Sequence, residues 1–325
     1  MSSRKIIITQ DLDQVLIDLV NENAPGCELI IGKNREIWGD HVKDAEIIAG
    51  WKGKIAKDLL LGNGFPSDTK LRWVQSWTAG INSLPLKELK ESGILLTTAN
   101  GVHSFPISET IFAFMLGLTR KIPAYIRNQQ SKTWNHSGLK HEIHGKTIGI
   151  FGVGSIGKET AKLSKAFGMK VLGFRRSGKP EEYVDQMYTL QEMNEVLPEC
   201  DYVVVTLPLT PETHQLFGAK QFTLMKPSAF FINIGRGDIA VESELVEALQ
   251  SKTIAGAGLD VFEQEPLSEN SPLWDLDNVI ITPHTSGSTE YYDKRVIEDI
   301  FIPNLRSYLK GETLPINLVD YDKGY

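Results

Sequence analysis

Short apolar runs in this chain alternate with stretches whose apolar residues recur at helical spacing. Short runs rich in Ile, Val and Leu are typical of strands buried in a parallel sheet. In the first part of the chain they predict strands at Lys5–Thr9, Glu28–Ile31, Glu46–Ala49, Arg72–Gln75 and Ile94–Thr98. Because helical patterns separate these strands, the segment predicts a doubly wound parallel sheet with helices on both faces.

The same alternation resumes in the middle of the chain and continues almost to its end. It predicts strands at Thr147–Phe151, Lys170–Phe174, Asp201–Leu207, Ala229–Ile234, Ile254–Asp260 and Val279–Thr282. Six parallel strands are the number expected of a dinucleotide-binding sheet. We therefore predict an α/β protein with two Rossmann-like, doubly wound parallel-sheet domains.

Two long helical patterns connect these halves. Ser104–Gln129 reads as one helix, in which Pro123 predicts a kink or a break. Ser288–Leu309 follows the last strand and could return the chain to the first domain. The pattern thus predicts a discontinuous substrate-binding domain, residues 1–100 and 289–325, interrupted by a dinucleotide-binding domain at residues 101–288.

Two segments carry no such pattern. Ser131–His144 is polar with an isolated Trp134, which is typical of an exposed arm, and Leu314–Tyr325 reads as a C-terminal tail.

A glycine turn joins the first two strands of the second domain. Gly152, Gly154 and Gly157 form a G-x-G-x-x-G motif between a strand and a helix, with Ser155 and Ile156 opening the helix. The three glycines permit a tight turn, the approach of a pyrophosphate and close helix–strand packing. The helix N-terminus supplies N–H groups and a positive dipole end for the phosphates. The alternative is a structural glycine turn in another kind of α/β protein.

Composition narrows the function classes. The formal net charge of -7 argues against a nucleic-acid-binding face, and no apolar run reaches the length of about 18 residues that a membrane span needs. The two cysteines, Cys27 and Cys200, lie far apart without metal-ligand spacing around them, so we expect no metal site. We therefore expect a reduced, cytoplasmic protein that binds neither nucleic acid nor membrane.

Three residues after predicted strands could carry chemistry: Arg236, Glu265 and His284. Ligands bind at the carboxyl ends of strands in open α/β sheets, so an arginine, a carboxylate and a histidine can converge there. Taken singly, a histidine in a loop is more often structural, and an arginine at a turn more often serves a surface ion pair.

These motifs together resemble the D-isomer-specific 2-hydroxyacid dehydrogenase family. GVGSIG, NIGRGD, GLDVFEQEP and ITPHTSG stand in the family's order and spacing, and the resemblance runs over nearly the whole chain. It implies a flavodoxin-like substrate domain beside the dinucleotide domain, a cleft between the two, and a homodimer. It also implies reduction of a small 2-oxo acid to the D-2-hydroxy acid.

The resemblance assigns roles to individual positions. Arg236 would bind the substrate carboxylate and polarise its 2-oxo oxygen, since a guanidinium donates two aligned hydrogen bonds. His284 would be the acid/base, and Glu265 would hold the imidazole and favour its protonated form.

Further residues would line the ligand sites by the same resemblance. The cofactor groove would include Thr206, Pro208, Ile234 and, near the nicotinamide carboxamide, Asp260. In the first domain, backbone N–H groups of Ala79, Gly80 and Ile81 would bind the carboxylate, with Trp51 and Trp77 shaping the pocket; simple core packing is the alternative for each tryptophan.

The cofactor position departs from the NAD-linked pattern. Where those members carry an acidic residue at the end of the second strand, this chain has Arg175, followed by Arg176 and Ser177. These residues can bind a 2′-phosphate, so we predict NADP(H) as the preferred cofactor, with NAD(H) possible. The alternatives are an NADH-linked dehydrogenase or a dinucleotide-sensing regulatory protein of the same fold. The sequence does not specify which 2-oxo acid is the substrate.

Overall fold

The computed structural model describes residues 4–60, 64–81, 84–136 and 138–321. The chain divides into two compact units: unit 1 comprises Met1–Val102 and Thr289–Tyr325, and unit 2 comprises His103–Ser288. The sequence had placed these crossings at 100/101 and 288/289. Each unit is built on a parallel sheet with helices on both faces, which confirms the predicted α/β class.

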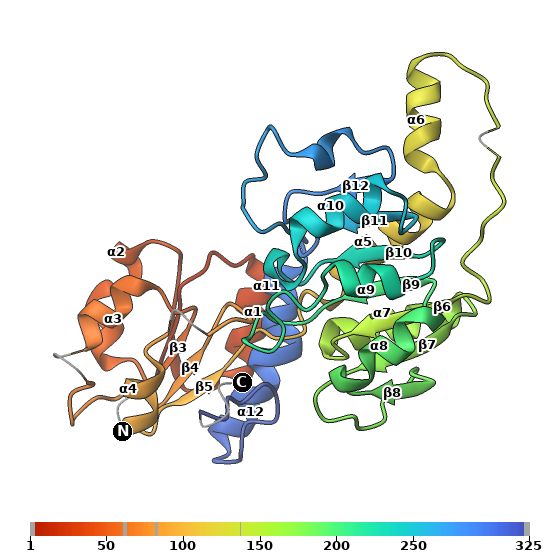
Figure 1. The fold of residues 1–325 in the computed structure, drawn as a ribbon. Helices are drawn as coiled ribbons and strands as arrows, with labels where there is room; N and C mark the ends of the chain where they lie inside the picture. Colours follow the sequence, from red (N-terminus) through yellow and green to blue (C-terminus); the bar gives the residue numbers. More distant parts are fainter. Residues whose placement is uncertain (1–3, 61–63, 82–83, 137, 322–325) are drawn as a thin grey trace. The chain divides into compact units, whose positions relative to one another are not determined.

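Unit 1 contains five strands: β1 (Arg4–Ile8), β2 (Cys27–Ile31), β3 (Ile47–Ala49), β4 (Trp73–Gln75) and β5 (Leu95–Thr97). Their order in the sheet is β2-β1-β3-β4-β5, and every pair is parallel. This is the flavodoxin-like order, and it confirms the prediction for this domain (Figure 1).

Helices cover both faces of the unit 1 sheet because the strand residues alternate in direction. Ile6 and Ile8 pack with α1 (Gln14–Asn23) and the C-terminal helix α12 (Ile302–Leu309). Ile7 packs on the other face, where the short helices lie: α2 (Arg35–Trp38), α3 (Gly53–Leu59) and α4 (Leu86–Glu91). Two apolar layers thus enclose the sheet.

Unit 2 contains seven strands: β6 (Thr147–Phe151), β7 (Lys170–Phe174), β8 (Gln186–Tyr188), β9 (Tyr202–Val205), β10 (Phe230–Asn233), β11 (Gly256–Leu259) and β12 (Val279–Ile281). They are parallel throughout, in the order β12-β11-β10-β9-β6-β7-β8. The expectation of six strands was wrong. The extra strand β8 has three residues at the sheet edge, none fully buried, and so lacks the apolar run by which the other strands were found.

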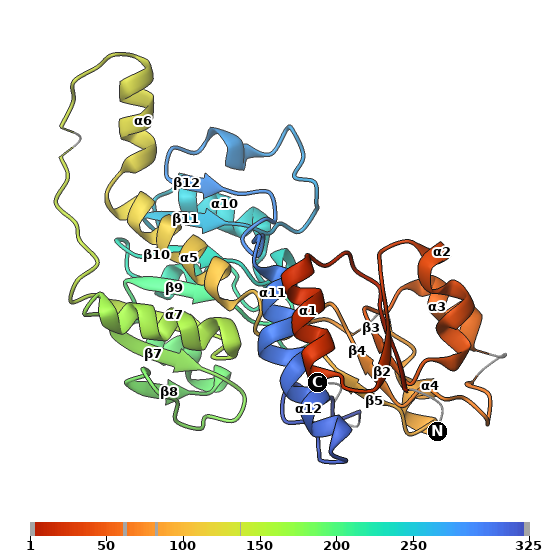
Figure 2. The same ribbon diagram turned by 180° about the vertical axis from the view of Figure 1, so that it is seen from behind.

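The direction of the strand order in unit 2 reverses between β6 and β9. Helices α5 (Ser104–Thr119) and α7 (Ser155–Ala166) cover one face, as Figure 2 shows from behind. The other face carries α8 (Met193–Val196), α9 (Ala219–Leu224) and α10 (Glu242–Gln250). The point of reversal is where open α/β sheets bind ligands.

The predicted helix over Ser104–Gln129 is two helices, α5 and α6 (Ile122–Gln130). Lys121 between them adopts a left-handed conformation with φ 55°, and Pro123 lies in the first turn of α6. The predicted break therefore occurs just before the proline, because a proline is tolerated at the start of a helix but not in its interior. Together with the segment that follows, α6 projects away from the sheet of unit 2 (Figure 1).

The predicted helix over Ser288–Leu309 begins later, at α11 (Tyr292–Arg295), and contains a π-helical turn over Val296–Phe301 before α12. Pro303 lies in the first turn of α12 and has no N–H to continue the preceding hydrogen-bond ladder. In the predicted tail, Leu318 forms an isolated antiparallel β-bridge with Thr97, the last residue of β5. Residues 322–325 of the tail lie outside the described residues. Among the helices that the structure describes, none is long and apolar enough to cross a membrane.

Candidate active site

The glycine turn between β6 and α7 is shaped by two close approaches of backbone. Gly152 has φ 111°, and a Cβ there would lie 2.8 Å from Thr206 Oγ1 and 2.9 Å from the Leu207 backbone nitrogen. A Cβ on Gly157 would lie 2.4 Å from the carbonyl oxygen of Gly152. Packing therefore requires glycine at both positions, as a tight strand-to-helix turn does.

Gly154 differs from these two glycines, because a Cβ there would meet no atom within 4 Å. It is the N-cap of the twelve-residue helix α7 and contributes no side-chain cap, so Ser155 and Ile156 open the helix with unsatisfied N–H groups. The turn lies beside the point where the strand order reverses. An open cradle with free N–H donors and a positive dipole end fits the pyrophosphate of a dinucleotide.

The other predicted cofactor-lining residues differ in their surroundings. Thr206 follows β9, and its hydroxyl donates to the Gly152 carbonyl oxygen at 2.6 Å, which ties the two strand ends together. Ile234 is buried in the apolar core after β10. Pro208 is exposed, and its carbonyl oxygen accepts from the hydroxyl of Thr213 at 2.7 Å.

Arg175 follows β7 and folds back onto the next turn. Its guanidinium donates to the carbonyl oxygens of Lys179 at 2.7 Å and Pro180 at 3.0 Å, and to Glu181 Oε2 at 3.0 Å. Glu181 Oε2 also contacts Lys158 Nζ, at 2.9 Å. Arg175 therefore also holds the turn over 175–181, a role that its sequence position does not reveal.

Arg176 and Ser177 are exposed at the same strand end. The Ser177 hydroxyl accepts from the Lys179 backbone N–H at 3.4 Å, so its own hydrogen can still be donated elsewhere. No acidic residue occupies the position directly after Phe174, where an NAD-linked sheet carries one.

His284 and Glu265 form a direct pair in which Nδ1 of the imidazole lies 2.7 Å from Oε2 of the carboxylate. The other carboxylate oxygen accepts from the backbone N–H of Phe262 at 3.1 Å, which holds the carboxylate in place. Both side chains remain accessible, with 49% and 36% of their surface exposed. An ionised carboxylate only accepts hydrogen bonds, so this pair favours the tautomer with a proton on Nδ1 and leaves Nε2 outside the pair.

Asp260 is fully buried and organises the segment that carries His284. Its carboxylate accepts from the hydroxyls of Thr282 and Ser286 and from the backbone N–H groups of Thr285 and Ser286. Its backbone carbonyl accepts from the His284 N–H at 2.9 Å, and His284 itself has φ 52°. Asp260 is thus a support for this segment, a role the sequence did not suggest, although the polar run after β12 could have indicated it.

Arg236 stands on a turn held by Asn233, the last residue of β10. The amide of Asn233 accepts from the Gly235 N–H and donates to the Arg236 carbonyl oxygen, both at 3.0 Å. A Cβ on Gly237 would lie 1.9 Å from the carbonyl carbon of Phe262, so the turn presses against the segment after β11. Within the described parts of the chain, Arg236 is exposed and has no carboxylate partner within 4.0 Å. Its charge is available to an anionic ligand.

These residues share one edge of the unit 2 sheet. Arg236 follows β10, Glu265 follows β11, and His284 follows β12, three neighbouring strands in the sheet. The carboxyl ends of parallel strands lie at the same edge. The structure brings His284 and Glu265 into contact and places Arg236 at the same edge without a direct contact to them.

In unit 1, the segment after β4 forms a tight loop. The Thr78 hydroxyl donates to the Gly80 carbonyl oxygen at 2.8 Å, while the N–H groups of Ala79, Gly80 and Ile81 donate to no residue that the structure describes. Adjacent N–H groups of this kind can donate hydrogen bonds to a carboxylate.

Two tryptophans near this loop have packing partners. Trp77 is 9% exposed and donates to Asp293 at 2.7 Å, whereas Trp51 packs edge-on against Phe65. Core packing accounts for Trp77, and Trp51 is half-buried.

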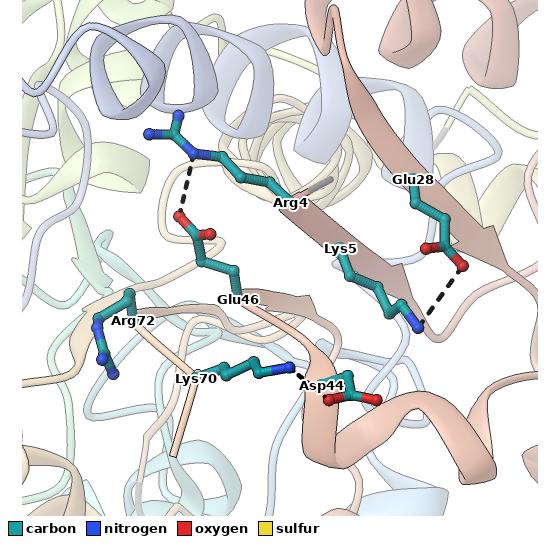
Figure 3. A pocket seen from close by; sticks show the side chains of 7 residues that line it. All are labelled: Arg4, Lys5, Glu28, Asp44, Glu46, Lys70 and Arg72. Carbon is teal, nitrogen blue, oxygen red and sulfur yellow. Dashed lines mark hydrogen bonds and ion pairs between the residues drawn. The ribbon is translucent and has the colours of Figure 1, made fainter. Parts of the chain in front are cut away.

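A cavity of about 470 Å³ lies elsewhere in unit 1, at the amino ends of the strands (Figure 3). Six of its seven lining residues form ion pairs: Arg4 with Glu46 at 3.4 Å, Lys5 with Glu28 at 3.6 Å and Lys70 with Asp44 at 2.7 Å. The seventh, Arg72, donates to the backbone carbonyl oxygens of Thr69 and Leu71. Surface ion pairs of this kind contribute little and carry no chemistry by themselves. The strand edge bearing His284 is the better candidate for an active site.

The chain is similar to known proteins over nearly its whole length. Residues 112–286 match the D-isomer specific 2-hydroxyacid dehydrogenase, NAD binding domain. The chain is 31% identical to a glyoxylate reductase of Thermococcus gammatolerans over 96% of this chain and 94% of that protein.

Two solved structures of this family are also similar over the whole chain. One is from Aeromonas salmonicida, with 34% identity and a TM-score of 0.80, covering 99% of this chain and 100% of that one. The other, from Xanthobacter autotrophicus in complex with NADPH and MES, has 28% identity, a TM-score of 0.77 and full coverage of both chains.

Alanine substitutions at two glycines of the β6–α7 turn should have different effects on stability and on dinucleotide binding. Gly154→Ala should leave stability unchanged, because its Cβ meets no atom, but should weaken dinucleotide binding at least tenfold by obstructing the pyrophosphate. Gly157→Ala should lower the free energy of unfolding by about 1–3 kcal/mol through overpacking, as well as weakening binding. Urea unfolding and calorimetric titration with NADPH and NADH separate the two effects. Unchanged affinity in Gly154→Ala would place the pyrophosphate elsewhere.

Proposed function

The chain belongs to the D-isomer specific 2-hydroxyacid dehydrogenase family, and from that premise we propose that it reduces a small 2-oxo acid to the D-2-hydroxy acid with NADPH. The observation that carries the proposal is the accessible His284–Glu265 pair at 2.7 Å. The exposed Arg236, which has no carboxylate partner among the described residues, lies on the same sheet edge. Glyoxylate and hydroxypyruvate are the first substrates to test, and the similarity to a glyoxylate reductase supports the former.

Each residue of this sheet edge has a separate role in the proposed reaction. When bound, the nicotinamide supplies the hydride in reduction and accepts it in oxidation. Arg236 binds the substrate carboxylate through its two-donor fork and draws electron density from the 2-oxo oxygen. His284 gives a proton from Nε2 to that oxygen in reduction and takes it back from the alcohol in reverse. Glu265 holds the ring through Nδ1 and stabilises its positive charge.

We expect His284→Ala to lower kcat by roughly 10²–10⁴, the usual scale for loss of a general acid. Cofactor affinity should stay the same, since the imidazole is assigned to the substrate. Steady-state rates with glyoxylate, hydroxypyruvate, pyruvate and branched or aromatic 2-oxo acids measure the first effect. Chiral chromatography identifies the isomer formed from every substrate except glyoxylate, whose product is achiral. His41→Ala in unit 1 is the matched control. Near-normal turnover of the His284 variant, or formation of the L-isomer, would refute the assignment.

We propose further that NADPH is preferred over NADH. Arg176 and Ser177 extend from the end of β7, and the position directly after Phe174 holds no acidic residue that would repel a 2′-phosphate. A charge-assisted hydrogen bond contributes on the order of 1.5–3 kcal/mol, and this value falls with exposure. One or two such contacts amount to roughly 10²-fold discrimination in kcat/KM.

The cofactor preference is measured as kcat/KM for NADPH and NADH at low and high ionic strength. The preference should weaken in salt, because exposed phosphate–arginine contacts are screened. Arg176→Ala should lower it about tenfold while leaving NADH kinetics unchanged. A wild-type enzyme that favours NADH would contradict the proposal.

We also propose that the protein forms a homodimer through α5, α6 and the polar arm at residues 131–144. No residue of α6 is fully buried, and Ile122, Ile126 and Trp134 are 47%, 49% and 93% exposed. Apolar side chains gathered on a projecting element are typical of an interface. Sedimentation at micromolar concentration should give twice the chain mass, and Trp134→Asp with Ile126→Asp should shift it toward the monomer. A monomeric wild-type protein would refute the dimer.

A further inference from the structure

The strand end that faces the predicted cofactor carries a carboxylate between two cations. Glu181 Oε2 lies 2.9 Å from Lys158 Nζ and 3.0 Å from Arg175 Nη1. The three residues come from helix α7, from the end of β7 and from the loop before β8. The Glu181 side chain is 18% exposed, less than Arg175 at 24% and Lys158 at 51%. The two cations therefore converge on one oxygen of a half-buried carboxylate.

This arrangement has a chemical counterpart in phosphate recognition. A phosphate oxygen, like a carboxylate oxygen, accepts charge-assisted hydrogen bonds from lysine and arginine. The end of the second strand in a dinucleotide sheet is where the adenosine ribose and its 2′-substituent are bound. Lys158 and Arg175 also hold the pKa of Glu181 below its usual range, Lys158 giving the larger effect, so the carboxylate remains charged near neutral pH.

We propose that Glu181 occupies the place of the 2′-phosphate when that group is absent, and that Lys158 is a further residue for binding it. The 2′-phosphate of NADPH competes with the Glu181 carboxylate for Lys158 and Arg175. Glu181 therefore lowers the affinity for NADPH and leaves the affinity for NADH unchanged. Glu181 is thus a specificity-determining residue. The inference rests on the proposed dinucleotide site and names the residues that set its preference.

The test uses adenosine fragments, which need no turnover. Calorimetry of the full-length protein with 2′,5′-ADP and with 5′-AMP gives two dissociation constants. Because the two fragments differ only in the 2′-phosphate, their ratio measures what that phosphate contributes to binding. Glu181→Gln keeps the shape of the side chain and removes its charge. It should tighten 2′,5′-ADP binding about three- to tenfold and leave 5′-AMP within twofold, the scale of a partly exposed ion pair.

Lys158→Gln should act in the opposite direction, weakening 2′,5′-ADP about three- to tenfold with 5′-AMP unchanged. The matched control is Glu199→Gln, which removes an exposed carboxylate paired with Lys170 at 3.1 Å in the same unit. Neither fragment should bind differently to the control. Thermal unfolding of each variant checks that the turn over 175–181 persists.

Each outcome decides a distinct question. The relevant ratio is the dissociation constant of 5′-AMP divided by that of 2′,5′-ADP. If Glu181→Gln leaves this ratio unchanged or lowers it, Glu181 does not compete with the phosphate and the inference is wrong. Weaker binding of both fragments would instead show that Glu181 accepts hydrogen bonds from the ribose hydroxyls, which also overturns it. If wild-type protein fails to discriminate the fragments and uses NADH better, the NADPH proposal fails, whereas a ratio that still rises in Glu181→Gln supports the competition.

Discussion

The buried carboxylate of Asp260 is the constraint on which the candidate active site depends. A buried carboxylate is stable only when hydrogen bonds replace its hydration, and here donors from the segment after β12 supply them. The backbone of that segment must therefore wrap around Asp260. His284 is held in a left-handed conformation as a result, since its N–H is bound to the Asp260 carbonyl.

Positioning at this edge is shared among residues that do no chemistry themselves. Asn233 closes the turn that presents Arg236, and the Phe262 N–H holds Glu265. Asn233 ends β10 and Phe262 follows β11, so the supports belong to neighbouring strands of one sheet. A parallel sheet thereby converts three distant sequence segments into one edge with a histidine, a carboxylate and an arginine.

The cofactor side of unit 2 depends on a different kind of constraint, the absence of side chains. Gly152 and Gly157 are required where backbone meets backbone, and Gly154 leaves the space that a ligand can enter. At the end of β7, by contrast, charge dominates. Glu181 balances Lys158 and Arg175, so the cation count read from the sequence overstates the positive charge available to a phosphate.

The sequence by itself determined the fold class and both sheets, because buried parallel strands need continuous apolar runs and these are visible locally. It also determined the glycine turn and the position of the His284, Glu265 and Arg236 motifs after strands. The sequence did not predict β8, the third strand of unit 2, because a three-residue edge strand forms only through its pairing with the neighbouring strand β7.

Only the tertiary structure decided which charges meet. The hydrogen bonds to buried Asp260 and the bridge of Glu181 to Lys158 and Arg175 connect residues that are separated in the chain, and such contacts leave no local pattern. The His284–Glu265 contact was implied by the family resemblance, but its geometry comes from the structure. The start of α6 and the π-helical turn before α12 were likewise set by the structure, although the prolines marked both regions. Local sequence patterns indicate which residues are buried and where the backbone turns. The hydrogen-bond and ion-pair partners of a side chain depend instead on the order of the strands in the folded sheet.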